Sequence, residues 1–246
     1  MTSTLSIGVI DPEVLGTYGD TGNALVLAAR AKARGIDADI HMIHLDQEIP
    51  ASIDIYVMGG GEDTAQALAA DHLRRSEGFL RALRDGRPLL AVCASLQILG
   101  RFYTDATGRE VAGAELLDIS TVPQGFRSIG EIVTEPLIEG LTQPLTGFEN
   151  HGGATSLGPD ARPLGRVTSG TGNATLTEGV ACDGACQSGI VATYMHGPVL
   201  PRNPELADLL LARATGVDAA SLAPLDMPLV DQLRAERLAF ARKESR

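Results

Sequence analysis

Lysine is scarce in this chain of 246 residues, and the glycines do not form a nucleotide-binding loop. Lys32 and Lys243 are its two lysines, and neither follows the Gly-x-x-x-x-Gly pattern of a phosphate-binding loop. Gly16, Gly19 and Gly22 are spaced Gly-x-x-Gly-x-x-Gly, which differs from the dinucleotide fingerprint. We therefore expect no cofactor in this chain. If the protein takes part in an ATP-driven reaction, another polypeptide must hold the ATP.

Long apolar runs, an export signal and excess positive charge are also missing. No run of about 18 apolar residues exists, and residues 1–4 show no signal-peptide pattern, so we expect a cytoplasmic protein that does not insert into a membrane. Three cysteines without an export signal argue against a disulfide framework. The net charge of −11 argues against nucleic acid or an anionic membrane as the primary partner.

The chain has enough apolar residues for one substantial α/β core, because 44% of it is hydrophobic. Short apolar runs alternate with helical stretches through the first hundred residues, which predicts a mainly parallel sheet with helices on both faces. Residues 115–176 carry short β-like segments and predict an antiparallel extension of that sheet. We expect strands over 5–10, 37–43, 53–58, 88–92 and 189–195, and helices over 23–34, 64–85, 205–214 and 230–243.

Cys93 and His196 are the leading candidates for catalysis. Cys93 ends the apolar run 88–92 and the chain turns there into a predicted helix, whose first N–H groups would favour a thiolate. His196 ends the apolar run 190–195. Both residues therefore belong to the carboxyl edge of a parallel sheet, where the imidazole could accept the thiol proton and later protonate a leaving amine.

Four further residues complete the predicted site. Gly60, within the triple glycine 59–61, and Ala94 could offer backbone N–H groups to a developing oxyanion. Arg127 could clamp a substrate carboxylate, because a guanidinium fork matches that anion. Gln97, one helical turn after the cysteine, could hydrogen-bond a polar substrate.

Other chemically capable residues receive plainer interpretations. His151, between Asn150 and two glycines, is a rival base. Cys182 and Cys186 could ligate a metal, but two thiols without further ligands are weak evidence, and we interpret them as ordinary loop cysteines. The segment 18–23, Tyr-Gly-Asp-Thr-Gly-Asn, most simply caps a helix.

These motifs together resemble a known family. Residues 91–100 (Ala-Val-Cys-Ala-Ser-Leu-Gln-Ile-Leu-Gly), 58–63 (Met-Gly-Gly-Gly-Glu-Asp) and 194–198 (Tyr-Met-His-Gly-Pro) resemble class I glutamine amidotransferases of the cobyric-acid-synthase type, with a flavodoxin-like fold. More narrowly, residues 18–23, 147–153 and 196–204 resemble the GatD family, the glutaminase subunits of lipid II isoglutaminyl synthase. The resemblance implies an amidotransferase domain over residues 5–216 and leaves 217–246 as a tail that packs on the core or on a partner.

The resemblance implies a function for each predicted site residue. Cys93 would be the nucleophile and His196 its base, Gly60 and Ala94 would form the oxyanion hole, and Arg127 and Gln97 would bind L-glutamine. The released ammonia would pass to a MurT-type, Mur-ligase-like subunit. That partner would use ATP and Mg to amidate D-glutamate of lipid II to D-isoglutamine in peptidoglycan synthesis.

The chain departs from the family pattern in two ways. Ala91 and Ser95 replace the usual glycines around the cysteine, which predicts a less strained turn. Pro198 stands where a glutamate usually follows the histidine by two residues. We therefore expect either a catalytic dyad or a third group supplied by the partner, in which case hydrolysis would depend on the complex.

Two other functions remain open. One is a cobyrinate or cobyric acid amidotransferase; such enzymes carry an additional N-terminal ATP-binding domain, whereas the amidotransferase-like part begins here at residue 5. The other is a non-catalytic scaffold subunit that docks to a ligase, against which the presence of both Cys93 and His196 argues.

Overall fold

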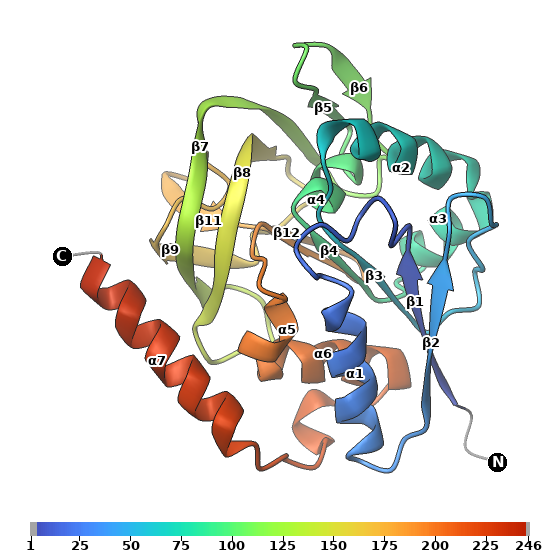
Figure 1. Ribbon diagram of the computed structural model, residues 1–246, viewed down its shortest axis with the longest axis vertical. Helices are drawn as coiled ribbons and strands as arrows, with labels where there is room; N and C mark the ends of the chain where they lie inside the picture. The colour runs from blue at the N-terminus through green and yellow to red at the C-terminus, as the bar shows by residue number, and fades with distance from the viewer. Residues whose placement is uncertain (1–3, 245–246) are drawn as a thin grey trace.

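A six-stranded sheet forms the centre of the protein in this computed structural model, which describes residues 4–244 (Figure 1). Its strand order is β12-β13-β4-β3-β1-β2, and every neighbouring pair is parallel except β12 with β13. The strands β3, β4 and β13 are buried along their whole length, which explains their uninterrupted apolar runs. The strands span β1 (Leu5–Ile10), β2 (Ala38–Ile43), β3 (Ile55–Met58), β4 (Leu89–Val92), β12 (Ala185–Gln187) and β13 (Ile190–Thr193).

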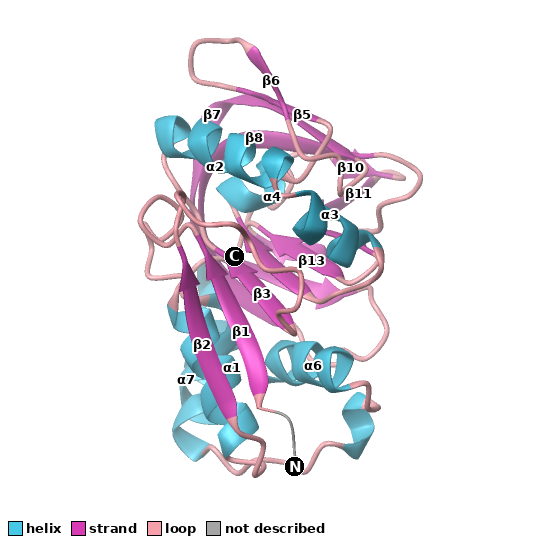
Figure 2. Ribbon diagram, turned by 90° about the vertical axis from the view of Figure 1, so that its right-hand side faces the viewer, coloured by secondary structure: helices cyan, strands magenta, loops and turns pink. Residues whose placement is uncertain are grey.

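Helices cover both faces of this sheet, as predicted. Figure 2 shows α2 and α3 on one face and α1 and α6 on the other. Arg30 of α1 donates two hydrogen bonds to the Asp208 carboxylate of α6, at 2.6 and 2.7 Å, which ties these two helices together. The helices span α1 (Gly22–Lys32), α2 (Asp63–Arg75), α3 (Glu77–Arg84), α4 (Ala94–Ile98), α5 (Val199–Arg202) and α6 (Pro204–Thr215).

The predicted antiparallel region forms a second sheet rather than further strands of the first. Both edges of its long strand β7 are occupied, by β8 on one side and by β5 and β9 on the other. The two sheets meet where Phe148 and His196 exchange backbone hydrogen bonds of 2.8 and 3.0 Å. The strands span β5 (Phe102–Thr104), β6 (Glu110–Ala112), β7 (Ile119–Pro136), β8 (Leu145–Leu157), β9 (Gly165–Ser169), β10 (Leu176–Thr177) and β11 (Val180–Asp183).

The tail contains the predicted helix, α7 (Pro228–Glu244), after a short 3-10 turn, η1 (Ala219–Ser221). The helix α7 contacts α5, β7 and β8, and Arg234 donates a 2.8 Å hydrogen bond to the Arg202 carbonyl. The tail therefore packs on the core through α7; residues 245 and 246 lie outside the described residues. Between residues 4 and 244, none of the helices is long and apolar enough to cross a membrane.

Candidate active site

Cys93 lies at a strained corner between β4 and α4. Its backbone has φ of 54° and ψ of −107°, a conformation that is costly for a residue with a side chain. Its N–H donates to the Thr193 carbonyl at 2.8 Å, and the Ser95 hydroxyl donates to the Gly59 carbonyl at 2.5 Å. The expectation of a less strained turn is therefore wrong, because these bonds hold the corner without the usual glycines.

His196 lies beside this corner, as its strand position predicts. The strands β13 and β4 are adjacent and parallel, so their carboxyl ends meet at one edge. Gly60 lies against both side chains: a Cβ at Gly60 would lie 2.6 Å from His196 Cε1 and 3.4 Å from Cys93 Cβ. The structure thus brings the predicted nucleophile and base together, and a side chain at position 60 would collide with the imidazole.

Asp20 supplies the carboxylate that the sequence was expected to lack. Its Oδ2 lies 3.0 Å from His196 Nδ1, and the side chain is fully buried. Pro198 packs against the start of α1, where a Cβ at Gly22 would lie 2.8 Å from its Cγ. The acid thus comes from the loop after β1 instead of from position 198. A carboxylate from the partner subunit is therefore not needed to orient His196.

The segment 18–23 has a different task from the capping that we expected. Thr21, the N-cap residue of α1, makes no side-chain capping bond. Asn23 Oδ1 instead accepts the Leu200 N–H at 2.9 Å, which fixes the segment after His196. The motif at residues 18–23 is visible in the sequence, but only the fold shows that its aspartate, Asp20, faces the His196 imidazole.

The electrostatics of His196 result from opposing influences. Burial alone would lower its pKa, but the hydrogen bond with Asp20 and the nearby Cys93 raise it to about 9. Because Asp20 occupies Nδ1, Nε2 is the ring nitrogen left for the Cys93 thiol. Nε2 has no other hydrogen-bond partner among the described residues. The raised pKa means that His196 stabilises the fold fully below pH 6.5, and that this contribution is lost as the pH rises through about 9.

The triple glycine is needed because the Asp20 loop packs directly on it. A Cβ at Gly59 would lie 2.1 Å from the Leu15 carbonyl oxygen. The N–H of Gly60, a predicted oxyanion donor, donates instead to Asp20 Oδ2 at 2.9 Å. The Gly60 N–H is thus engaged in this conformation, and the oxyanion roles of Gly60 and of Ala94, the residue after Cys93, stay predictions.

Gln97 and Arg127 share a pocket of about 220 Å³. The N–H of Gln97 donates to the Cys93 carbonyl at 3.3 Å, so α4 connects this pocket to the sulfur. Arg127 is exposed, and its Nε donates to Asn150 Oδ1 at 2.6 Å. A larger cavity of about 460 Å³ lies at the amino end of β4 and is lined by none of the predicted site residues. The smaller pocket is therefore the one that contains predicted substrate-binding residues, and glutamine binding there stays a prediction.

Two residues that sequence reasoning missed link this pocket to the imidazole. Asn150 Nδ2 donates to the Tyr18 hydroxyl at 2.7 Å. The ring of Tyr18 lies against His196, with 4.4 Å between the ring centroids. Arg127 is thereby connected to His196 through side chains from β8 and from the loop after β1.

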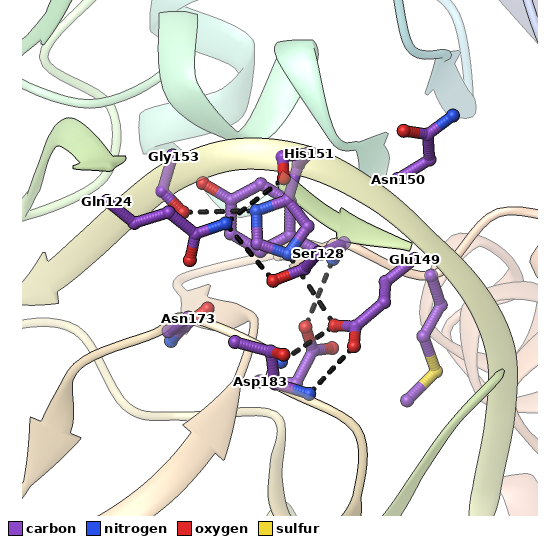
Figure 3. A network of polar contacts seen from close by, with 12 residues as sticks. Gln124, Ser128, Glu149, Asn150, His151, Gly153, Asn173 and Asp183 are labelled. Atoms are coloured by element: carbon purple, nitrogen blue, oxygen red, sulfur yellow. Dashed lines mark hydrogen bonds and ion pairs between the residues drawn. The ribbon is translucent and has the colours of Figure 1, made fainter. Parts of the chain in front are cut away.

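The rival base His151 lies in a separate buried network (Figure 3). Its Nδ1 donates to the Gly153 carbonyl at 3.0 Å, and its Nε2 lies 3.5 Å from Glu149 Oε2. Glu149 in turn accepts two backbone N–H groups at 2.7 and 2.8 Å. Both ring nitrogens of His151 therefore face groups other than the Cys93 thiol.

Cys182 and Cys186 are strand residues, which corrects their interpretation as loop cysteines. Cys182 lies on β11 of the second sheet and Cys186 on β12 of the first. Burial raises the pKa of both thiols, to about 12 for Cys186. Neither thiol takes part in the arrangement around Cys93.

Solved structures of a glutamine amidotransferase and of a glutaminase domain share this fold. A crystal structure of a glutamine amidotransferase matches 85% of this chain and 98% of its own, with a TM-score of 0.53 at 20% identity. The glutaminase domain of Trypanosoma brucei CTPS with bound acivicin matches 87% of this chain and 95% of its own, with a TM-score of 0.53 at 11% identity. At such identities the likeness concerns the fold alone.

The family model of the CobB/CobQ-like glutamine amidotransferase domain matches residues 6–204, and the chain belongs to this family. The lipid II isoglutaminyl synthase subunit GatD of Staphylococcus aureus is 35% identical over 93% of this chain and 91% of its own. GatD of Streptococcus pneumoniae is 33% identical over 85% and 80%. The cobyric acid synthase of Sphingopyxis alaskensis is 32% identical over 71% of this chain but 34% of its own. The predicted resemblance is confirmed, and the protein is a glutamine amidotransferase.

Proposed function

We propose that this chain is the glutaminase subunit of a lipid II isoglutaminyl synthase. It hydrolyses L-glutamine to glutamate and ammonia, and a MurT-type ligase subunit uses the ammonia to amidate D-glutamate of lipid II to D-isoglutamine. The observation that carries this proposal is the alignment of Cys93, His196 and Asp20 in a chain that matches GatD over nine-tenths of its length.

Hydrolysis begins with acylation of the cysteine. His196 Nε2 takes the proton of the Cys93 thiol, and the sulfur attacks the side-chain carbonyl carbon of glutamine. The N–H of Ala94 donates to the oxyanion that forms. The imidazolium, held by Asp20 at Nδ1, then gives its proton to the leaving nitrogen, so that ammonia departs and a thioester remains.

The second half regenerates the thiol. Water attacks the thioester carbonyl while His196 Nε2 takes a proton from it. The carbon–sulfur bond then breaks to release glutamate, and the imidazolium returns the proton to the Cys93 sulfur. Arg127 binds the α-carboxylate of glutamine throughout, and Gln97 donates to an acceptor oxygen of the same substrate.

The partner carries the energy-requiring step in this proposal. ATP and Mg bind to the MurT-type subunit, which activates the carboxylate of lipid II, and lipid II is a substrate of the complex. The complex works in the cytoplasm, where both L-glutamine and ATP are available.

Co-purification with a MurT-type ligase, followed by amidation of lipid II, tests this function. We expect glutamine-dependent amidation from the complex with the intact chain. With Cys93→Ala we expect no glutamine-dependent amidation, while added ammonium restores the product. Unchanged glutamine-dependent activity in Cys93→Ala would instead indicate a scaffold subunit. Amidation of a cobyrinate substrate in place of lipid II would indicate the cobyric-acid type of enzyme.

A further inference from the structure

The amide of Gln97 lies in a chain of hydrogen bonds whose direction is fixed at one end. Gln66 Nε2 lies 3.4 Å from the Ala94 carbonyl oxygen and 2.6 Å from Gln97 Oε1. A backbone carbonyl can only accept, so the Gln66 atom that faces it must be the amide nitrogen. Gln97 must then turn its own oxygen toward Gln66 and its nitrogen the other way.

Tyr194 receives that nitrogen. Gln97 Nε2 lies 3.2 Å from the Tyr194 hydroxyl oxygen, which therefore accepts one of its two N–H groups. The phenol proton is left to donate to Thr155 Oγ1 at 2.7 Å. Thr155 then donates to Thr121 Oγ1 at 2.8 Å. The direction of donation therefore runs from Gln66 through Gln97, Tyr194 and Thr155 to Thr121.

The position of the phenol is itself held from behind. The ring of His151 stacks on Tyr194, with 3.7 Å between centroids and 16° between planes. The imidazole is tied to Gly153 and Glu149, as Figure 3 shows. Tyr194 is fully buried, so its hydroxyl has no solvent to turn to. The ring therefore cannot swing away from Gln97 without breaking buried contacts.

The second N–H of the Gln97 amide is the one that can donate to a substrate in the pocket. A Cβ at Gly153 would lie 2.6 Å from Gln97 Nε2, so glycine is needed there for the amide nitrogen to reach the pocket edge. Arg127 lines the same pocket and adds a cation. An amide N–H and a guanidinium together suit a carboxylate oxygen.

We propose that Tyr194 is a positioning residue for glutamine binding, because its oxygen holds the Gln97 nitrogen toward the pocket for donation to the substrate carboxylate. Gln66 fixes which way the Gln97 amide faces. Loss of the Tyr194 acceptor leaves one Gln97 N–H without a partner, so the amide nitrogen is no longer held at the pocket edge where it can donate to the carboxylate. The inference rests on the proposed glutaminase activity and concerns affinity for glutamine rather than the chemical step.

Tyr194→Phe, studied in the complex with the ligase subunit, tests the role. We expect the KM for L-glutamine in glutamate release to rise at least about fivefold, because a buried donor loses its acceptor. The value of kcat and the pH profile should stay close to those of the wild type. Tyr56→Phe is the matched control: it removes another fully buried phenol, whose hydroxyl donates to the Pro50 carbonyl, and should leave KM unchanged.

Thr155 provides a second test that leaves the tyrosine intact. Thr155→Val removes the acceptor of the phenol proton. That proton can then turn toward Gln97 Nε2 and displace the amide nitrogen from its position, so KM should rise. Thr155→Ser keeps the hydroxyl and should restore the wild-type KM. If Tyr194→Phe does not fold, the comparison of Thr155→Val with Thr155→Ser tests the positioning role of Tyr194.

Two results would overturn the inference in distinguishable ways. If the wild-type complex hydrolyses glutamine while Tyr194→Phe and Thr155→Val both match Tyr56→Phe in KM, the inference fails and the proposed function stands. If the wild-type complex releases no glutamate from glutamine, the proposed function fails and the inference fails with it.

Discussion

His196 and His151 are two buried imidazoles that each lie beside a carboxylate, yet they are suited to different tasks. His196 follows the end of β13, and Asp20 holds its Nδ1 so that Nε2 faces the Cys93 thiol. His151 lies in the middle of β8, where a carbonyl binds Nδ1 and Glu149 faces Nε2. In the proposed mechanism His196 acts as the base because one of its ring nitrogens is left for the sulfur, and a carboxylate partner alone does not confer that role.

The largest effect should come from removing the free nitrogen. In His196→Gln we expect kcat/KM for glutamine hydrolysis to fall at least about 10³-fold, because the residue moves protons in both half-reactions. Steady-state glutamate release measures this loss, and ammonium-dependent amidation by the complex checks that the subunit still folds. The exposed His41→Gln is the matched control and should keep full activity. A His196→Gln variant with a tenth of normal activity would contradict the assignment.

Removing the carboxylate behind His196 should have the next largest effect. In Asp20→Asn we expect kcat to fall about 10²-fold, since the imidazolium loses its orientation and its counter-charge. Asp20 raises the pKa of His196, so the variant should lose activity at lower pH on the alkaline side of the profile. Asp39→Asn, the same change on the exposed side of β2, should alter neither quantity. An Asp20→Asn variant with a normal pH profile would indicate that the partner subunit supplies the third catalytic group.

Arg127 tests the binding half of the site. Arg127→Lys keeps the charge but loses the planar fork, so we expect KM for glutamine to rise about tenfold with little change in kcat. Initial rates over a range of glutamine concentrations separate the two parameters. Arg84→Lys, at an exposed position on α3, serves as the control. A fall in kcat without a change in KM would place Arg127 outside the carboxylate site.

The smallest effect on activity should come from His151. His151→Phe keeps a ring against Tyr194 but removes the imidazole contacts of the Gly153 carbonyl and of Glu149. We expect kcat/KM to stay within about fivefold of wild type while the free energy of unfolding falls by about 1–3 kcal/mol. Denaturant titration measures the second quantity. A loss of activity as large as that of His196→Gln would make His151 a base after all.

The elements that depend on local pattern were predictable from the sequence. Cys93 and His196 each end an apolar run, and parallel strands deliver such residues to one edge. Asp20 was missed because it reaches His196 across 176 positions of the chain, and its motif also fits a helix start. The second sheet was missed because residue patterns give strands but not their partners. The engagement of the Gly60 N–H by Asp20 depends on tertiary packing in the same way.

The central claim is that Asp20, His196 and Cys93 act as one unit, and an NMR titration of the His196 ring tests it most directly. The chain contains five histidines, so the His196 signals are assigned by their loss in His196→Gln. We expect His196 to titrate near pH 9 in the wild type and at a clearly lower pH in Asp20→Asn. A ring that titrates near pH 6.5 in both proteins would contradict the account.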